Sequence, residues 1–316
     1  MNRRTVTVAT TLAVAWRSQD AVYDEDGTLC GEEMQKLSDD QLAAIGRLVV
    51  ACGRRSLDMA AGSFKVYEKG LDDYVTDVDR ALDAQLAGGL SELFPEDGVI
   101  SEENAASRQN FSQHHGRLWL VDPLDGTEDF IHGKPHYSVM VGELVAEQPQ
   151  SGWVYAPVFD QLYFGGREQG LFTQTATQAI APLVPTEPPL TGDRCPILIG
   201  TKDARRYGDA ILRHIPQAQF GFIGSFGLKV LEVIQGRAGL YLYLNRRVKL
   251  WDTVGPLALA QAAGLVCCDL VGNPIRFDES ALDLDTLTHH QPILVGWPQY
   301  IETLRSPLQQ AIAEVS

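Results

Sequence analysis

Carboxylic acids lie at three places in the sequence where an apolar segment ends or a helix is expected to begin. Glu102 comes directly after one apolar segment, and Asp122 and Asp125 follow a second one. Asp252 lies in a third place, within the tripeptide Trp-Asp-Thr. Segment ends are where a rigid scaffold presents reactive groups. The sequence therefore predicts a site built from carboxylates.

The segment Asp-Pro-Leu-Asp at 122–125 has a spacing suited to a hard cation such as Mg²⁺. Pro123 fixes its own φ and stiffens the turn. Asp122 and Asp125 can then point into one small volume, with the carbonyl of Leu124 between them. Because Mg²⁺ prefers oxygen ligands, this arrangement predicts a magnesium site.

The next two residues, Gly126 and Thr127, suit a phosphate group. A glycine at a helix start lets backbone N–H groups approach a phosphate closely. The threonine adds a hydroxyl beside the predicted metal. An acidic turn with a glycine is, on its own, more often only a solvated turn. The prediction of a metal site therefore depends on agreement among the separate motifs.

Other polar residues are weaker candidates for catalysis or metal binding. In an extended segment Glu103 points away from Glu102, so we expect it to be solvated or to lie behind the site. The spacing of His132 and His136 would suit zinc on a helix, but the glycine and proline between them favour a loop.

Capping and periodicity predict two helices in the first part of the chain. Ser38 and Gln41 fit a capping box, and apolar residues recur at helical spacing to about residue 61. A second helix is expected from about Asp77, after a polar loop. Strands are then expected at 118–121, where the run stops at Asp122, and at 137–145, 152–158, 161–164 and 170–173. The turn residues between these strands favour antiparallel pairing.

Strands and helices alternate after a proline-rich linker at 186–194. This alternation is typical of an α/β domain. Strands are expected at 196–200, 220–223, 240–244, 266–269 and 293–295, and helices at 205–214, 226–235, 252–263 and 301–315. We therefore expect three parts: an N-terminal extension over 1–37, an α+β metal-binding domain over 38–185 and an α/β domain over 191–316.

The net charge of −15 limits the possible partners. A negative field of this size repels nucleic acid and anionic membrane surfaces, so neither is an expected partner. It would also repel a phosphorylated substrate unless bound cations reverse the sign locally. Clustered carboxylates in such a chain are therefore a further indication of metal ions.

The compartment is expected to be the cytoplasm. The five cysteines are an odd number without a CxxC pair, which favours a reducing environment. The sequence lacks an apolar run of about 18 residues, so we expect no membrane helix. The N-terminal stretch has two arginines and a weakly apolar run but no clear cleavage site, so we do not expect a signal peptide.

Taken together, the motifs resemble the inositol monophosphatase-like superfamily. The matching segments occur in that family's order at 73–79 (DYVTDVD), 100–103 (ISEE), 119–130 (WLVDPLDGTEDF) and 251–264. The resemblance covers most of the chain from about residue 40. It implies an α/β fold that is a layered αβαβα sandwich, with an antiparallel sheet in the N-terminal domain. It also implies a phosphatase that uses two or three Mg²⁺ ions.

The resemblance further implies the metal ligands. Glu102, Asp122 and the Leu124 carbonyl match the ligands of one metal, and Asp122, Asp125 and Asp252 match those of a second. A third, more weakly bound metal would contact Glu102 through a water molecule, which makes Glu102 a catalytic candidate as well. Two cations about 3.5–4 Å apart would clamp the attacking and leaving oxygens of a phosphomonoester.

The remaining catalytic roles also come from the resemblance. Thr127 and Asp79 match the pair that orients the attacking water and helps to deprotonate it. Gly126 and Thr127 match the backbone that holds the phosphate. Positioning and charge are most of what a protein contributes to such a reaction.

Within the superfamily, the chain is most similar to the 3′(2′),5′-bisphosphate nucleotidase branch. The similar segments are ISEEN at 100–104, VYAP at 154–157, GSFGLK at 224–229 and DLVGNP at 269–274. This branch implies lithium-sensitive hydrolysis of adenosine 3′,5′-bisphosphate to AMP and phosphate. Activity of the inositol monophosphatase or inositol polyphosphate 1-phosphatase type is the alternative.

A substrate with two phosphates needs a second anion site. Lys229 at an expected helix start is one candidate, together with Ser225 in the glycine-rich turn before it, and Lys249 is another. Either lysine would otherwise be a surface charge. Gly255-Pro256 and Met140-Val-Gly142 depart from the usual pattern, which leaves the acids untouched but bears on substrate choice.

Two other classes of protein remain as rivals to a phosphatase. A catalytically silent homologue would bind a metal or a nucleotide phosphate without turnover. A calcium-stabilised structural protein would be stabilised by Ca²⁺ but would leave Thr127 and Asp79 unexplained. The expected partner is a small phosphorylated substrate, either a bisphosphate nucleotide or an inositol phosphate, and the expected state is a monomer or homodimer.

Overall fold

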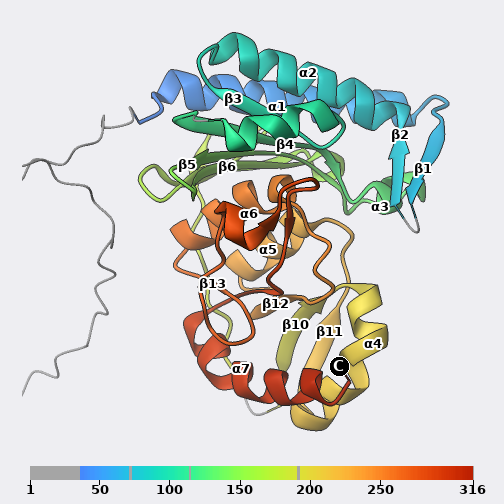
Figure 1. Ribbon diagram of the computed structural model, residues 1–316, viewed down its shortest axis with the longest axis vertical. Coiled ribbons are helices and arrows are strands. Elements are labelled where there is room, and N and C mark those ends of the chain that lie inside the picture. The colour runs from blue at the N-terminus through green and yellow to red at the C-terminus, as the bar shows by residue number, and fades with distance from the viewer. Residues whose placement is uncertain (1–35, 71–72, 114, 191–192, 316) are drawn as a thin grey trace, which may run out of the picture. The chain divides into compact units, whose positions relative to one another are not determined.

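Helices and sheets alternate in layers in the computed structural model of the chain (Figure 1). The structure describes residues 36–70, 73–113, 115–190 and 193–315. The extension expected over 1–37 lies almost wholly outside these residues. Residues 38–316 form one compact unit, and the division expected near residue 190 stays a prediction.

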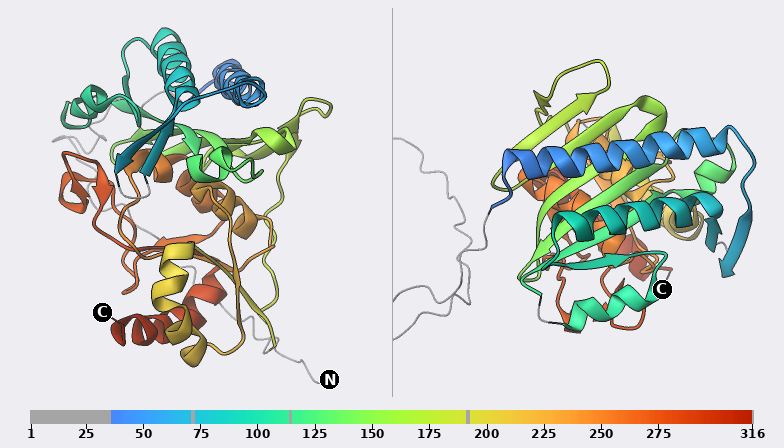
Figure 2. Two further views of the ribbon diagram at one scale, coloured as in Figure 1. Left: turned by 90° about the vertical axis from the view of Figure 1, so that its right-hand side faces the viewer. Right: turned by 90° about the horizontal axis from the view of Figure 1, so that it is seen from above.

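Two long helices form the first layer. Helix α1 (Asp39–Ala60) begins at Ser38, and the capping box predicted with Gln41 is present. Helix α2 (Asp77–Leu93) begins at Thr76, whose hydroxyl accepts hydrogen bonds from the backbone of the first turn. The apolar faces of both helices are buried. The two helices lie across one face of the first sheet (Figure 2).

An antiparallel hairpin joins these helices where the sequence predicted a polar loop. Its strands are β1 (Val66–Gly70) and β2 (Asp73–Thr76). All five residues of β1 are exposed, so the strand has no buried face and hence no alternating apolar pattern. The prediction of a loop was wrong for that reason.

The first sheet has the strand order β3-β4-β5-β6-β7-β8-β9 in the described residues. Strands β3 and β4 are parallel, joined by the 3₁₀ helix η1 (Ala105–Ser112), and the other neighbours are antiparallel, as predicted. The strands are β3 (Gly98–Ser101), β4 (Arg117–Asp125), β5 (Ser138–Val145), β6 (Gln148–Ala156), β7 (Gln161–Gly166), β8 (Gly170–Thr175) and β9 (Ala181–Pro182).

Strand β4 does not end at Asp122 as predicted but continues through Pro123 to Asp125. Asp122 pairs with Met140 of β5, and Asp125 pairs with Ser138, so β4 carries one extra residue between these two pairs. Such a bulge tolerates a proline and re-aims the side chains around it. The motif is thus a bulged strand end rather than a separate turn.

The other face of this sheet is covered by helices α5 (Phe226–Ile234) and α6 (Leu250–Ala262). Helix α6 contacts β5 and β6 at three glycines, Gly142, Gly152 and Gly255. A Cβ atom added to Gly142 or Gly152 would collide with the backbone of Gly255. The absence of side chains therefore lets this helix lie directly on the sheet.

A second sheet follows, with the order β11-β10-β12-β16-β13. Strands β10, β11 and β12 are parallel, and β16 runs antiparallel to its neighbours. Helices α4 (Thr201–His214) and α7 (Pro298–Ala313) form the last layer (Figure 1). The strands are β10 (Cys195–Ile199), β11 (Ala218–Gly221), β12 (Leu240–Tyr243), β13 (Val266–Cys268) and β16 (Ile293–Gly296).

The layered αβαβα arrangement implied by the resemblance is therefore the fold of this chain. A short hairpin of β14 (Leu282–Asp283) and β15 (Thr288–His289) lies outside both sheets and was not predicted. Among the described helices, none combines the length and the apolar character needed to cross a membrane.

Candidate active site

Three carboxylates from two distant parts of the sequence converge. Asp122 and Asp125 come from the bulged end of β4, and Asp252 comes from the first turn of α6. One oxygen atom from each lies within 4.8 Å of the others. The glycine contact between α6 and β5 and β6 makes this approach possible, since it sets the distance of the helix from the sheet.

Asp252 is fixed by its own helix. The backbone N–H of Lys249 donates to Oδ2 of Asp252 over 2.6 Å. One residue further on, Thr253 is buried, and its hydroxyl lies 2.9 Å from Nε2 of His289 in β15. The short hairpin thereby anchors the start of α6 beside the carboxylates.

Asp125 is held by the start of helix α5. Its carboxylate accepts hydrogen bonds from Ser225 Oγ at 2.5 Å and from the backbone N–H groups of Phe226 at 3.0 Å and Gly227 at 2.9 Å. A carboxylate offers about four lone-pair positions. Oδ2 also accepts a hydrogen bond from Ser138 Oγ over 3.4 Å. Most of these positions are therefore committed to holding the side chain, and a further ligand would bind at Oδ1.

Glu102 lies in the turn directly after β3, where its backbone N–H donates to the carbonyl of Val121 over 3.1 Å. Lys69 of the β1–β2 hairpin places its ammonium 3.4 Å from Glu102 and 2.5 Å from Glu103. Glu103 was expected to be solvated or behind the site, and its carboxyl is indeed largely buried. Burial, with the nearby charge of Glu102, raises the pKa of Glu103 to about 7.

The carboxylates repel one another. Burial and then the charges of Glu102, Asp125 and Asp252 raise the pKa of Asp122 well above its ordinary value. Burial, Glu102 and Asp125 raise the pKa of Asp252 to about 7. Buried acids of this kind need a compensating positive charge. A donor set of carboxylate oxygens fits a hard divalent cation such as Mg²⁺.

Thr127 and Asp79 are hydrogen-bonded to each other. Thr127 Oγ1 lies 3.1 Å from Oδ1 of Asp79 and 3.0 Å from the carbonyl oxygen of Leu124. A hydroxyl has one proton, so it donates to one of these acceptors at a time. Asp79 is buried at the start of α2, where Thr76 donates to its other oxygen, and burial raises its pKa.

Gly126 connects the carboxylates to the short helix α3 (Thr127–Ile131). Its φ of 94° lies in the left-handed region that favours glycine. A Cβ at this position would lie 3.1 Å from both the carbonyl of His136 and the backbone nitrogen of Ser225. Both the backbone conformation and the close neighbours therefore require a glycine here.

Comparisons with known proteins agree with this geometry. The sequence matches the family model described as "Inositol monophosphatase family" over residues 32–312, which is most of the chain. The chain belongs to the inositol monophosphatase family. It is therefore a phosphatase of the metal-dependent kind.

Sequence relatives within the family differ in the substrates that their names give. "Inositol monophosphatase 3" of Solanum lycopersicum is 30% identical over 228 residues, which are 68% of this chain and 80% of the relative. "3′(2′),5′-bisphosphate nucleotidase CysQ" of Escherichia coli K12 is 31% identical over 212 residues, covering 67% and 82%. Both the superfamily and the similarity to the nucleotidase branch are thus confirmed.

Solved structures of the family share the fold. An IMPase from Thermotoga maritima has a TM-score of 0.71 at 18% identity and covers 88% of this chain and 100% of its own. A staphylococcal IMPase I in complex with products has a TM-score of 0.65 at 21% identity, with 80% and 89% covered.

The substrate-binding residues predicted from the sequence are less exposed than expected. Ser225 is fully buried and caps α5 while it donates to Asp125, so it would have to break that bond to contact a substrate. Lys229 is only 5% exposed, and its ammonium donates to the carbonyl of Gly224 over 2.9 Å. Lys249 is half-buried, with its ammonium 5.3 Å from the ring centre of Trp251.

The burial of Lys229 gives it an electrostatic partner that the sequence did not reveal. Burial lowers its pKa to about 8, while Asp125 and Asp129 favour the charged form. An ammonium in this position is a counter-charge to Asp125. The buried location of this ammonium shows that Lys229 is not a surface charge, and it disfavours Lys229 as part of an open phosphate site.

Sequence reasoning missed several residues that support the site. Ser138 lies opposite Asp125 on β5, and its hydroxyl bonds to that of Ser225 over 2.9 Å. Asp83 of α2 accepts hydrogen bonds from Ser101 and from the backbone of Glu103. The supporting roles of Ser138 and Asp83 follow from the register of the strands and the packing of a helix. Neither feature can be predicted from the local sequence.

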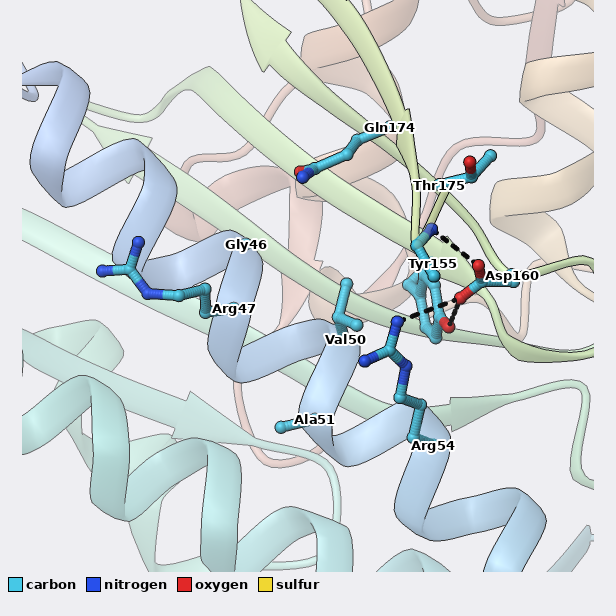
Figure 3. A pocket seen from close by; sticks show the side chains of 10 residues that line it. Gly46, Arg47, Val50, Ala51, Arg54, Tyr155, Asp160, Gln174 and Thr175 are labelled. Carbon is cyan, nitrogen blue, oxygen red and sulfur yellow. Dashed lines mark hydrogen bonds and ion pairs between the residues drawn. The ribbon is translucent and has the colours of Figure 1, made fainter. Parts of the chain in front are cut away.

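A separate cavity of about 280 Å³ lies beside α1, away from the clustered acids (Figure 3). Among the described residues that line it, Asp160 is the only carboxylate. It accepts hydrogen bonds from Tyr155 and from the backbone of Ala176, both over 2.7 Å, and pairs with Arg54 at 3.4 Å. Because this acid is already satisfied, the cavity does not fit a divalent metal.

Proposed function

We propose that this phosphatase is a Mg²⁺-dependent 3′(2′),5′-bisphosphate nucleotidase that releases the 3′-phosphate of adenosine 3′,5′-bisphosphate. The observation that carries the proposal is the convergence of Asp122, Asp125 and Asp252 beside the hydrogen-bonded pair of Thr127 and Asp79. The nucleotide is favoured by the segments similar to that branch and by the CysQ relatives.

Inositol monophosphatase activity is the second candidate. It is favoured by relatives with that name at the same level of identity, including one from Mesembryanthemum crystallinum at 30%. Both candidates use the same carboxylates, so they differ only in the group that carries the reacting phosphate.

Glu102, Asp122, Asp125, Asp252 and the Leu124 carbonyl are the groups that would hold the metal ions. Bound there, Mg²⁺ would neutralise phosphate oxygens and lower the pKa of a coordinated water. The residues themselves supply fixed negative charge, and Asp125 is kept rigid by its bonds to the start of α5. Rigid placement matters because a small misplacement of reacting groups costs much of the rate.

Thr127 and Asp79 would orient the attacking water and take up its proton. Thr127 Oγ1 can accept a hydrogen bond from water while its own proton points to Asp79 Oδ1. The raised pKa of Asp79 makes its carboxylate a better proton acceptor near neutral pH. The backbone N–H groups at the start of α3, after Gly126, would bind the phosphate oxygens.

Replacing Thr127 by alanine is expected to lower kcat by about 10²-fold with little change in KM. The lost hydroxyl acts on the water and not on the bound ground state. Steady-state kinetics on adenosine 3′,5′-bisphosphate in Mg²⁺ would measure both constants. Thr127→Ser keeps the hydroxyl and serves as the matched control, with most of the activity retained. A Thr127→Ala enzyme that mainly raises KM would make Thr127 a binding residue instead.

A phosphate-release panel in Mg²⁺ tests the substrate. It includes adenosine 3′,5′-bisphosphate, inositol 1-phosphate, inositol 1,4-bisphosphate and fructose 1,6-bisphosphate. We expect the highest kcat/KM for the nucleotide and release of its 3′-phosphate, with AMP as the organic product. A clear preference for inositol 1-phosphate would replace the nucleotidase proposal with the second candidate and leave the metal chemistry unchanged.

A further inference from the structure

A cavity of about 560 Å³ opens at the carboxyl ends of strands β10 and β12. From β10 the chain passes through α4 to β11 on one side, and then through α5 to β12 on the other side. The connections therefore diverge between β10 and β12. In open α/β sheets, ligands bind in the crevice outside the strands at such a point.

Basic side chains line this cavity. Lys202 and Arg206 come from the first turns of α4, and Arg246 and Arg247 come from the loop after β12. Asp203 is the one carboxylate among the described residues that line it. In a chain with a net charge of −15, the exposed Arg206, Arg246 and Arg247 around this hollow create a local field that attracts anions.

Hydrogen bonds hold the loop that carries Arg246 and Arg247 in a defined conformation. Asp203 is 2% exposed, and its Oδ2 accepts a hydrogen bond from the backbone N–H of Leu244 over 2.8 Å. The next residue, Asn245, accepts one from the N–H of Arg247 over 3.1 Å. Arg246 has a φ of 55°, a conformation that residues other than glycine rarely adopt. Asp203 thus holds the loop through its carboxylate, and Arg206, Arg246 and Arg247 are exposed at the cavity.

The same loop leads directly to the carboxylates of the active site. Arg247 is two residues from Lys249, whose N–H holds Asp252. Two residues span at most about 7 Å, so the arginine backbone lies close to the start of α6. Lys229, the sequence-based candidate for a second phosphate, is buried with its ammonium bonded to Gly224. The basic cavity is therefore a better candidate than Lys229 for binding a second phosphate.

We propose that this cavity binds the second, non-reacting phosphate of the substrate, so that the enzyme selects small molecules with two separated phosphate groups. The inference rests on the proposed function, because the reacting phosphate must lie at the carboxylates. The negative charge of the whole chain opposes a nucleic acid, so a small bisphosphate is the fitting ligand.

The test compares two substrates that differ only in the second phosphate, adenosine 3′,5′-bisphosphate and adenosine 3′-monophosphate. The variants are Arg206→Gln, Arg247→Gln and the double variant. Arg205→Gln is the matched control, because Arg205 is the exposed neighbour of Arg206 on α4 and does not line the cavity. We expect the double variant to lower kcat/KM for the bisphosphate about tenfold or more, mainly through KM.

The same variant should change kcat/KM for the monophosphate by less than about twofold, since neutralised arginines leave the carboxylates in place. The control should match the unmodified enzyme on both substrates. Equal losses on both substrates, unchanged bisphosphate kinetics in the double variant, or an unmodified enzyme that does not discriminate between the two would overturn this inference. Failure of the unmodified enzyme to hydrolyse any phosphomonoester in Mg²⁺ would instead reject the proposed function.

Discussion

Asp122→Asn is expected to reduce phosphate release at least about 10³-fold while the fold survives. The side chain is 1% exposed, and burial and then the charges of Glu102, Asp125 and Asp252 raise its pKa. An amide has nearly the same shape but lacks the negative charge that a shared metal ligand supplies. The loss should therefore appear in kcat, with the metal no longer bound in its productive place.

Thermal unfolding without metal separates the loss of charge from a loss of structure. Removing one of several repelling carboxylates should leave Tm unchanged or raise it. Adding Mg²⁺ should raise Tm of the unmodified protein and have little effect on the variant. Asp58→Asn, on the exposed side of α1, is the control and should behave like the unmodified protein. A variant with near-normal turnover in Mg²⁺ would show that the metal ligands are wrongly assigned.

Gly152→Ala is expected to destabilise the protein by about 3 kcal/mol or more, which lowers Tm by about 5 °C or more. The added methyl group would collide with the carbonyl of Gly255 in α6. The obstacle is backbone, so it cannot be relieved by a change of rotamer. Helix α6 would have to move off the sheet, and Asp252 would move with it. Activity should therefore fall further than the change in stability alone explains.

Gly88→Ala is the matched control for this substitution. Gly88 is exposed in α2, and a Cβ there meets nothing within 4 Å. Alanine in a helix is favoured over glycine by about 0.5–1 kcal/mol, so this variant should be as stable as the unmodified protein or more so. If Gly152→Ala were equally well tolerated, the close contact between α6 and the sheet would not be what positions Asp252.

Periodicity and capping were sufficient to predict the long helices. Ser38 and Gln41 form the predicted capping box, and α5 ends within one residue of its predicted end. The β1–β2 hairpin was missed because a strand without a buried face leaves no alternating pattern. The end of β4 was missed because proline usually marks the end of a strand, whereas here it lies in a bulge that pairing with β5 accommodates.

The sequence motifs predicted which carboxylates would cluster but not what supports them. Asp122, Asp125 and Asp252 come together through long-range packing, in particular the approach of α6 to the sheet. The hydrogen bonds from α5 to Asp125 and the burial of Lys229 depend on the same packing. Local sequence carries residue type and spacing, whereas the direction of a lysine side chain depends on neighbours far along the chain.

Phosphate release as a function of Mg²⁺ tests the central claim most directly. The protein is first stripped of metal with a chelator, and adenosine 3′,5′-bisphosphate and inositol 1-phosphate are then offered while Mg²⁺ is titrated. We predict no release above background without the cation and a return of turnover that saturates with Mg²⁺ in the unmodified protein but not in Asp122→Asn. Equal turnover with and without chelator, or no release from any phosphomonoester at saturating Mg²⁺, would contradict the account.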